Sequence, residues 1–166
     1  MREFTSFGDF AGFLGTLGAI VEADRRGLDR ATKLIQKTAK AKIGDYQDQS
    51  GPFAPWAPLA ASTIAEKQSL GYTGQVSEDD PLLRTGEMRE SIERTFGAKE
   101  GYVGSNSDIM VYQELGTRHI PPRSVLGGAA VEKATEVVEI IGEQTYLTLI
   151  GGGVFQGALP IYEGKP

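Results

Sequence analysis

The sequence predicts an α+β fold, with a small antiparallel sheet flanked by a long N-terminal helix and a long C-terminal helix. Apolar residues recur at steps of three and four near both ends of the chain, as they do along one face of a helix. Between these regions, residues 92–96 and 101–105 are short strand-like runs joined by a turn-forming segment. A chain of 166 residues suffices for one domain, which we assign to residues 1–150.

The first helix is predicted over residues 10 to about 43. Its apolar stripe consists of Phe10, Phe13, Leu14, Leu17, Ile20, Val21, Leu28, Ala31, Ile35 and Ala39. Gly44 follows as a stop signal. Gly12, Gly15 and Gly18 are weak helix formers that lie away from this stripe, where they would let another helix approach closely.

Shorter elements are expected in the middle of the chain. Residues 46–58 predict a loop with Trp56 as its apolar anchor, and residues 59–68 can form a short helix. Residues 69–81 contain few apolar groups and predict an exposed loop. Residues 108–115 fit either a strand or a helix, and we favour the helix.

The last helix is predicted from Val125 to about Ile150, with Ser124 as its N-cap. A run of three glycines that begins at Gly151 should end it. Residues 151–166 are then expected to form a C-terminal tail that is flexible or bound to a partner.

Composition excludes several classes of function. The chain has no cysteine and a single histidine, which rules out disulfides and thiol chemistry and argues against a histidine-based metal site. A net charge of −5 argues against non-specific nucleic-acid binding by the whole surface. The apolar run at residues 10–21 is shorter than the roughly 20 residues that span a bilayer, and its flanks lack the positive charge of a signal peptide. We therefore expect a cytoplasmic protein without a membrane partner.

The two predicted long helices carry charged stripes of opposite sign. The basic stripe is Arg26, Arg30, Lys33, Lys37 and Lys40, and the acidic stripe is Glu132, Glu136, Glu139 and Glu143. Both have steps of four and three residues, so each lies on one helix face, opposite the apolar one. Residues 25–42 carry seven basic side chains and one acidic one, a net charge of +6 against −5 for the whole chain.

Three interpretations of these stripes stay open. The simplest is that each is a solvated helix face. If both helices pack on one sheet, the stripes point outward and cannot meet within one molecule, so pairing would need a neighbouring subunit and would favour a ring. In the third interpretation the basic stripe contacts DNA in a ring lumen through its phosphates. We rank subunit pairing above DNA because the basic stripe has no interleaved aromatic residues.

Two short blocks stand out between the long helices. In the first, residues 81–92, Thr85 and Gly86 predict a turn in which Gly86 has a positive φ, unless the Thr85 hydroxyl caps the following turn. Leu83, Met88 and Ile92 of this block should face the core.

The second block, residues 112–124, directly precedes the last helix. Gly116 should end the preceding element, and Pro121 and Pro122 impose extended backbone. Arg123 then lies at a helix N-terminus, where a cation is unfavourable, so we expect compensation by Glu114 or by a neighbouring chain. His119 is expected to be an exposed loop histidine.

These blocks, with Trp56-Ala57-Pro58-Leu59 upstream, resemble the virion morphogenesis proteins of long-tailed bacteriophages. The shared order is a Trp-x-Pro-Leu stretch, a Leu-x-x-Thr-Gly turn, and a Gly-Thr and Ile-Pro-x-Arg segment before the last helix. The resemblance covers about residues 50–130 and implies the same α+β fold. It also implies that Arg123 is a structural or interface residue. Val125 stands where the family often has an aromatic residue.

An enzyme is the less favoured class. The available acids are Glu87, Glu90 and Glu114, with Ser91 and Thr117 near them in sequence. They form no serine–histidine–acid order, phosphate-binding glycine loop or metal-ligand spacing, although a pair of carboxylates stays possible.

The resemblance implies a structural virion protein without a cofactor that completes the tail or joins head to tail as a ring. Its partners would be further copies of itself and the connector, tail-tube or terminator proteins beside it. The alternative from another class is a DNA-associated connector or packaging accessory that uses the basic stripe. We expect the protein in the virion, and in the host cytoplasm during assembly.

Overall fold

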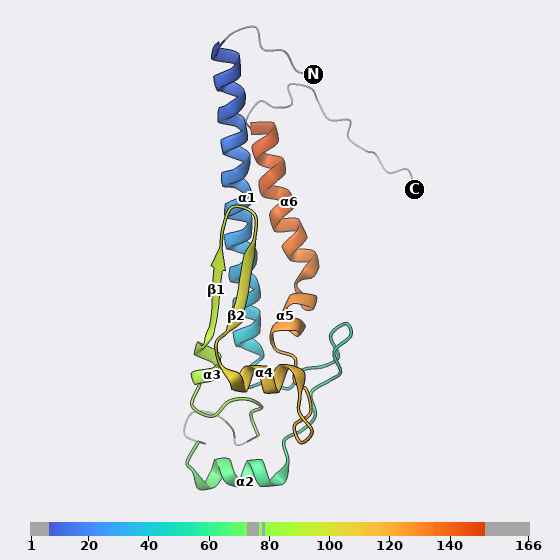
Figure 1. Ribbon diagram of the computed structural model, residues 1–166. Helices are drawn as coiled ribbons and strands as arrows, with labels where there is room; N and C mark the ends of the chain where they lie inside the picture. The colour runs from blue at the N-terminus through green and yellow to red at the C-terminus, as the bar shows by residue number, and fades with distance from the viewer. Residues whose placement is uncertain (1–6, 73–76, 78, 152–166) are drawn as a thin grey trace, which may run out of the picture.

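The structure is a computed structural model that describes residues 7–72, 77 and 79–151. The helices are α1 (Phe7–Lys42), α2 (Ala61–Ser69), α3 (Glu87–Glu90), α4 (Asp108–Leu115), α5 (Leu126–Glu132) and α6 (Ala134–Gly151) (Figure 1). The strands are β1 (Ile92–Phe96) and β2 (Gly101–Ser105), which form one antiparallel sheet. This arrangement confirms the predicted α+β class.

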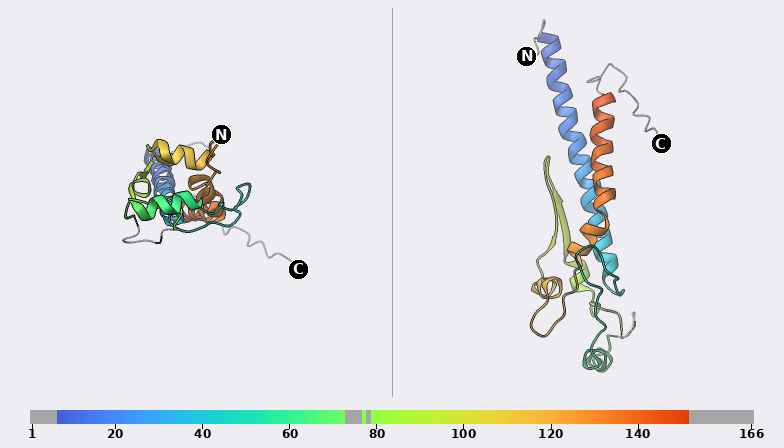
Figure 2. Two further views of the ribbon diagram at one scale, coloured as in Figure 1. Left: turned by 90° about the horizontal axis from the view of Figure 1, so that it is seen from below. Right: turned by 90° about the vertical axis from the view of Figure 1, so that its right-hand side faces the viewer.

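The long helices α1 and α6 lie side by side and run in opposite directions (Figures 1 and 2). Gly27 lies where they touch, because a Cβ atom on this residue would be 3.3 Å from Ile141 Cα. Gly12, Gly15 and Gly18, which we expected to allow a close approach, have no atom within 4 Å of such a Cβ. The close helix contact therefore lies at a glycine that the sequence did not single out. The side chains of Phe10, Phe13, Leu14, Leu17 and Ile20 lie outside the described part of the structure.

The prediction of one continuous last helix is wrong. Lys133 separates α5 from α6 because its backbone (φ −99°, ψ 7°) departs from helical values. Hydrogen bonds from Lys133 N to Ala129 O and from Val137 N to Lys133 O span the interruption. The helical segment begins at Leu126 and reaches Gly151, one residue later than expected at each end, while residues 152–166 lie outside the described part.

The hairpin packs on α1, with Ile92 paired to Ser105 and Phe96 to Gly101. Gly101 permits this contact, since a Cβ there would be 2.6 Å from Thr32 Cγ2. Gln36 Nε2 donates a 2.8 Å hydrogen bond to Ile92 O. The strands thus cover α1 from one side, with the residue bounds that the sequence predicts.

The core lies at the end of α1 where the loops converge. It consists of Ala39, Ile43, Trp56, Leu83, Ile92, Met110, Val125 and Ala129. Gly44 ends α1 with a φ of +113°, and its N–H donates to Pro81 O at 3.0 Å. Residues 69–81 were predicted to form an exposed loop, but Pro81 at its end is buried. Residues 73–76 and 78 of this loop lie outside the described part.

Candidate interaction site

The second sequence block, residues 112–124, closes on itself at the N-terminus of α5, where Glu114 caps the helix. Its Oε2 accepts hydrogen bonds from the N–H groups of Val125 (2.7 Å) and Leu126 (2.9 Å). Its Oε1 accepts the Gly127 N–H (2.8 Å) and the Ser124 hydroxyl (2.6 Å). These bonds satisfy N–H groups that have no partner within the helix, and a carboxylate is favourable at this end of the helix dipole.

Ser124 completes the cap. The sequence predicted Ser124 as the N-cap but did not predict that Glu114 shares this role. Its Oγ accepts the Gly128 N–H at 3.0 Å, while its own proton goes to Glu114. Gly127 makes room for this arrangement, because a Cβ there would lie 2.6 Å from Phe53 Cζ and 3.1 Å from Glu114 Oε1. The cap therefore depends on a carboxylate ten residues before Ser124 in the chain, on α4.

Arg123 does not pair with Glu114. It is buried, with 5% of its surface exposed, and its Nη2 donates to the carbonyl oxygens of Ala57 (2.8 Å) and Pro58 (3.4 Å). Its backbone N–H donates to Gln113 O at 2.6 Å. Burial lowers the pKa of the Arg123 guanidinium. Arg123 thus holds the segment after Trp56 against the end of α4. This is a structural role, one of the two roles, structural or interface, that the resemblance implies for Arg123.

A cavity of about 360 Å³ opens beside Arg123, between α2, α4 and the loop before α3. Its apolar wall includes Leu59, Leu82, Met88, Ile109 and Ile120, and its polar groups include Thr63, Lys67, Asp80, Gln113, His119 and Arg123. Lys67 is 2% exposed, and its Nζ donates to Asp80 O at 2.8 Å. A mostly apolar cavity with a few converging polar groups is the kind of site that binds a ligand or a side chain of another molecule.

The other residues of the two blocks shape the backbone. Gly86 has a φ of +87°, as predicted, while Thr85 Oγ1 is 3.4 Å from the Glu87 N–H and adds only a long hydrogen bond. Gly116 has a φ of +74°, and a Cβ there would lie 2.9 Å from Pro122 N. Pro121, Pro122 and His119 are exposed. Within the described ranges, no group of three or more His, Cys, Asp or Glu could hold a metal ion.

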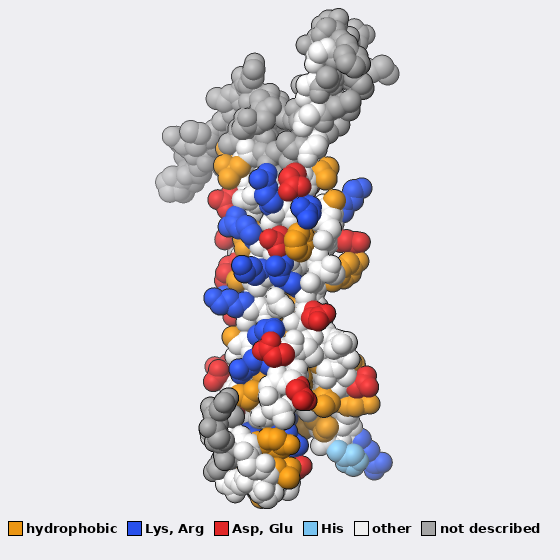
Figure 3. Space-filling view, turned by 90° about the vertical axis from the view of Figure 1, so that its left-hand side faces the viewer, with side chains coloured by type: hydrophobic (Ala, Val, Ile, Leu, Met, Phe, Trp, Pro, Cys, Tyr) orange, Lys and Arg blue, Asp and Glu red, His pale blue; other side chains and the backbone are white. Residues whose placement is uncertain are grey.

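The expectation that the charged stripes cannot meet within one molecule is wrong. Because α6 packs directly on α1, Arg30 Nη1 lies 3.8 Å from Glu143 Oε2. Lys40 pairs instead with Glu90 at 3.0 Å. Figure 3, which views the molecule from the left-hand side of Figure 1, shows Lys and Arg side chains along its length with Asp and Glu among them.

Four other members of the stripes are unpaired within the described part of the structure. Arg26, Lys33, Lys37 and Glu139 are exposed and form no ion pair with any described residue. The number of exposed and unpaired charges on the two stripes is therefore smaller than the sequence suggested.

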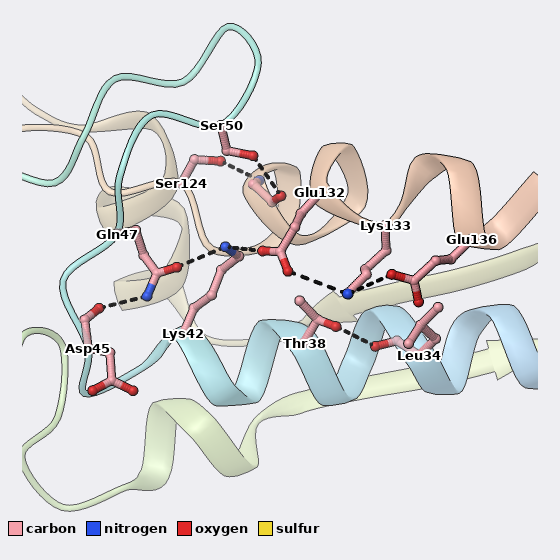
Figure 4. Close-up of polar contacts among 11 residues, drawn as sticks. Leu34, Thr38, Lys42, Asp45, Gln47, Ser50, Ser124, Glu132, Lys133 and Glu136 are labelled. Atoms are coloured by element: carbon pink, nitrogen blue, oxygen red, sulfur yellow. Dashed lines mark hydrogen bonds and ion pairs between the residues drawn. The ribbon is translucent and has the colours of Figure 1, made fainter.

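A buried lysine outside the predicted basic stripe links α1 to α5 through an ion pair. Lys42 Nζ lies 2.7 Å from Glu132 Oε2 and donates to Gln47 Oε1 at 2.9 Å (Figure 4). The hydrogen bond from Lys42 is the largest influence on Glu132, and it lowers the pKa of that carboxyl group. Lys133 pairs with Glu136 at 2.7 Å, and that hydrogen bond raises the pKa of Lys133.

The sequence did not single out the exposed apolar face of α4. Ile109, Val111, Tyr112 and Leu115 are exposed, with Leu115 at 74%, and Met110 alone is buried in this helix. The available signal was that five of the eight residues of α4 are apolar, more than a single buried face of so short a helix requires. Ile109 also lines the cavity beside Arg123, so the apolar face and the cavity are continuous. We name Ile109, Val111, Tyr112 and Leu115 the α4 patch.

Comparison with protein-family models, with curated proteins and with solved structures found no match to this chain. Of the helices that the structure describes, none is both long and apolar enough to cross a membrane.

Proposed function

We propose that this chain is a structural virion protein of a tailed phage or prophage that completes the tail or joins head to tail by binding. The observation that carries the proposal is the α4 patch. Four exposed apolar side chains on eight helical residues, beside a cavity, are typical of a surface that another protein covers. The segments that resemble virion morphogenesis proteins build this end of the molecule, which links the patch to that family.

The partners that fit this surface are connector, tail-tube or terminator proteins. The test is to delete the gene from a phage or prophage that encodes the chain and to examine its particles by electron microscopy. Unjoined heads and tails, or incomplete tails, are expected, and added purified protein should restore joining. Tyr112→Ser with Leu115→Ser should fold but fail to restore joining.

Leu70→Ser is the matched control, because Leu70 is 56% exposed at the end of α2 and does not belong to the α4 patch. If the double variant restores joining as well as the control does, the α4 patch is not the binding surface. Particles that assemble normally without the gene would contradict the proposed function itself.

We also propose that the subunits form a ring in which Arg26, Lys33 and Lys37 face Glu139 and its neighbours on the next copy. The free charges on both stripes support this pairing, which would set register more than affinity. Lys33→Glu with Lys37→Glu should lower the oligomer fraction at low salt in native mass spectrometry, and Lys99→Glu should not. An unchanged oligomer fraction in the first variant would argue against this pairing.

The second candidate function is that of a DNA-associated connector accessory, favoured by the same three free cations. Retention on DNA at physiological ionic strength, with an affinity that falls steeply with salt, would support it. Loss of retention below physiological salt, or retention that survives charge reversal at Lys33 and Lys37, would argue against it.

A further inference from the structure

Two side chains that line the cavity beside Arg123 carry polar atoms without partners. Arg123 itself is 5% exposed, and among the described residues only its Nη2 atom has acceptors, while its Nε atom is buried without one. Gln113 lines the same cavity, and its Oε1 atom is a buried acceptor with no donor. Buried polar atoms in proteins almost always have partners. A molecule bound in the cavity would supply both a donor and an acceptor to these side chains.

The charge of the cavity wall favours an anion. Arg123 is a buried cation that forms no ion pair with any described residue, and an unpaired buried charge is unfavourable. The other charged side chains of the wall are Lys67, Arg84 and Asp80, and Arg84 pairs with Glu66 outside it. Cations therefore outnumber acids on the described wall. A guanidinium offers only donors, in a planar arrangement that fits a carboxylate.

The rest of the wall is apolar and continues beyond this cavity. Leu82, Met88 and Ile109 line both the cavity beside Arg123 and a second cavity of about 420 Å³ that reaches Ser91. Leu82 has a φ of +63°, a conformation that costs energy in a bulky residue and is found preferentially at ligand sites. Ile109 is 59% exposed and joins this wall to the α4 patch. A ligand in the first cavity can therefore extend along an apolar surface.

We propose that the cavity beside Arg123 binds the carboxyl-terminal residue of a partner protein, where that residue is large and apolar. Its terminal carboxylate would pair with Arg123, and its backbone N–H would donate to Gln113 Oε1. Its side chain would pack on Leu82, Met88 and Ile109. The volume of about 360 Å³ lies near the lower limit of ordinary ligand sites, which suits one or two residues. The partner's identity rests on the proposed function, but binding itself can be measured without a virion.

A free carboxylic acid with an apolar body shares this chemistry, but two observations favour a peptide. Gln113 Oε1 needs a donor, which a main-chain N–H supplies and an ionised simple acid does not. The apolar wall also continues into the second cavity, so the ligand can continue past the mouth of the first one.

Short synthetic peptides test the proposal on the full chain. The probe is acetyl-Gly-Gly-Leu with a free carboxylate. One control is the same peptide as a carboxyl-terminal amide, and the other is isocaproate, an ionised acid with a leucine-like body but no N–H. Shift changes in amide NMR spectra should centre on Ile109, Gln113 and Ile120. The probe should bind at least about tenfold more tightly than either control, because each control lacks one of the two polar contacts.

Matched variants place the binding on the cavity wall. Ile109→Glu adds a negative charge to the wall that both cavities share, so it should weaken probe binding by about tenfold or more. Val111→Glu is the control, because Val111 is 49% exposed on the same helix and lines neither cavity. Gln113→Leu should weaken binding of the probe and leave that of isocaproate unchanged. Circular dichroism checks that each variant folds.

The possible outcomes separate the parts of the proposal. Equal affinity for the peptide amide would overturn the carboxylate assignment, and isocaproate that binds as tightly as the probe would overturn the peptide. Shift changes outside the cavity, or none up to about 10 mM probe, would overturn the site. Unjoined heads and tails in the gene deletion, together with absent probe binding, would leave the proposed function standing and remove only this ligand.

Discussion

The Glu114 carboxylate lies 2.6 Å from the Ser124 hydroxyl, and together they accept four consecutive N–H groups at the start of α5. The two residues come from the ends of one sequence block, on either side of the Gly116 turn. Their contact closes this block on itself and fixes α4 against α5. Because α4 carries the exposed patch, this contact also orients the proposed binding surface.

Replacing Glu114 should destabilise the fold without removing an apolar contact. Glu114→Gln loses the negative charge and one acceptor oxygen, and we expect a loss of about 2 kcal/mol in the free energy of unfolding. Urea denaturation would measure it. Glu87→Gln is the control, since Glu87 is exposed and its side chain makes no hydrogen bond or ion pair among the described residues. Equal stability of the two variants would show that water replaces the cap.

Arg123 should not tolerate lysine. Arg123→Lys keeps a positive charge, but a single ammonium lacks the planar set of donors that reaches Ala57 O while the stem stays packed. We expect a loss of about 2 kcal/mol in the free energy of unfolding. Chemical denaturation checks it against Arg118→Lys, whose side chain is exposed. A neutral Arg123→Lys would mean that charge alone matters at this position.

The contact between Gly101 and Thr32 predicts a size-dependent mutant pair. Gly101→Ala places a Cβ within 2.6 Å of Thr32 Cγ2, so we expect a loss of about 1–3 kcal/mol in the free energy of unfolding. Thr32→Ser removes that methyl group and keeps the hydroxyl that bonds Leu28 O.

The double variant Gly101→Ala with Thr32→Ser should recover much of the loss that Gly101→Ala causes, which a double-mutant cycle in urea would reveal. Strictly additive effects would contradict a direct clash between these two residues.

Acid should weaken the Lys42–Glu132 link. The folded state holds the pKa of Glu132 below its ordinary value of 4.5, so ionised Glu132 contributes stability above that pH. This contribution is lost as pH falls from about 4.5 through the lower folded-state pKa. Unfolding measured at pH 6 and pH 3 should show a smaller pH-dependent loss for Glu132→Gln than for the natural chain. Equal losses would assign the acid sensitivity to other carboxylates.

Local patterns predicted most of the secondary structure. The bounds of β1 and β2 follow from short β-prone runs around a turn, and α1 follows from a long stripe of apolar residues that ends at Gly44. Gly86 has the positive φ that its turn requires. These features depend on neighbours within a few residues, which a sequence displays directly.

Packing decided the rest. Helical periodicity shows which face of α1 is apolar, but not that α6 would lie on it, so the Arg30–Glu143 pair could not be foreseen. The roles of Glu114 and Arg123 could not be read from their positions, because their partners lie at the α5 N-terminus and in the loop after Trp56. The exposure of the α4 patch depends equally on which helix face the core covers. The sequence by itself determined most of the elements and their order, apart from the break at Lys133, since these follow from local backbone preference. Only the tertiary structure decided which charges are paired and which apolar groups stay uncovered, because both depend on contacts between distant segments.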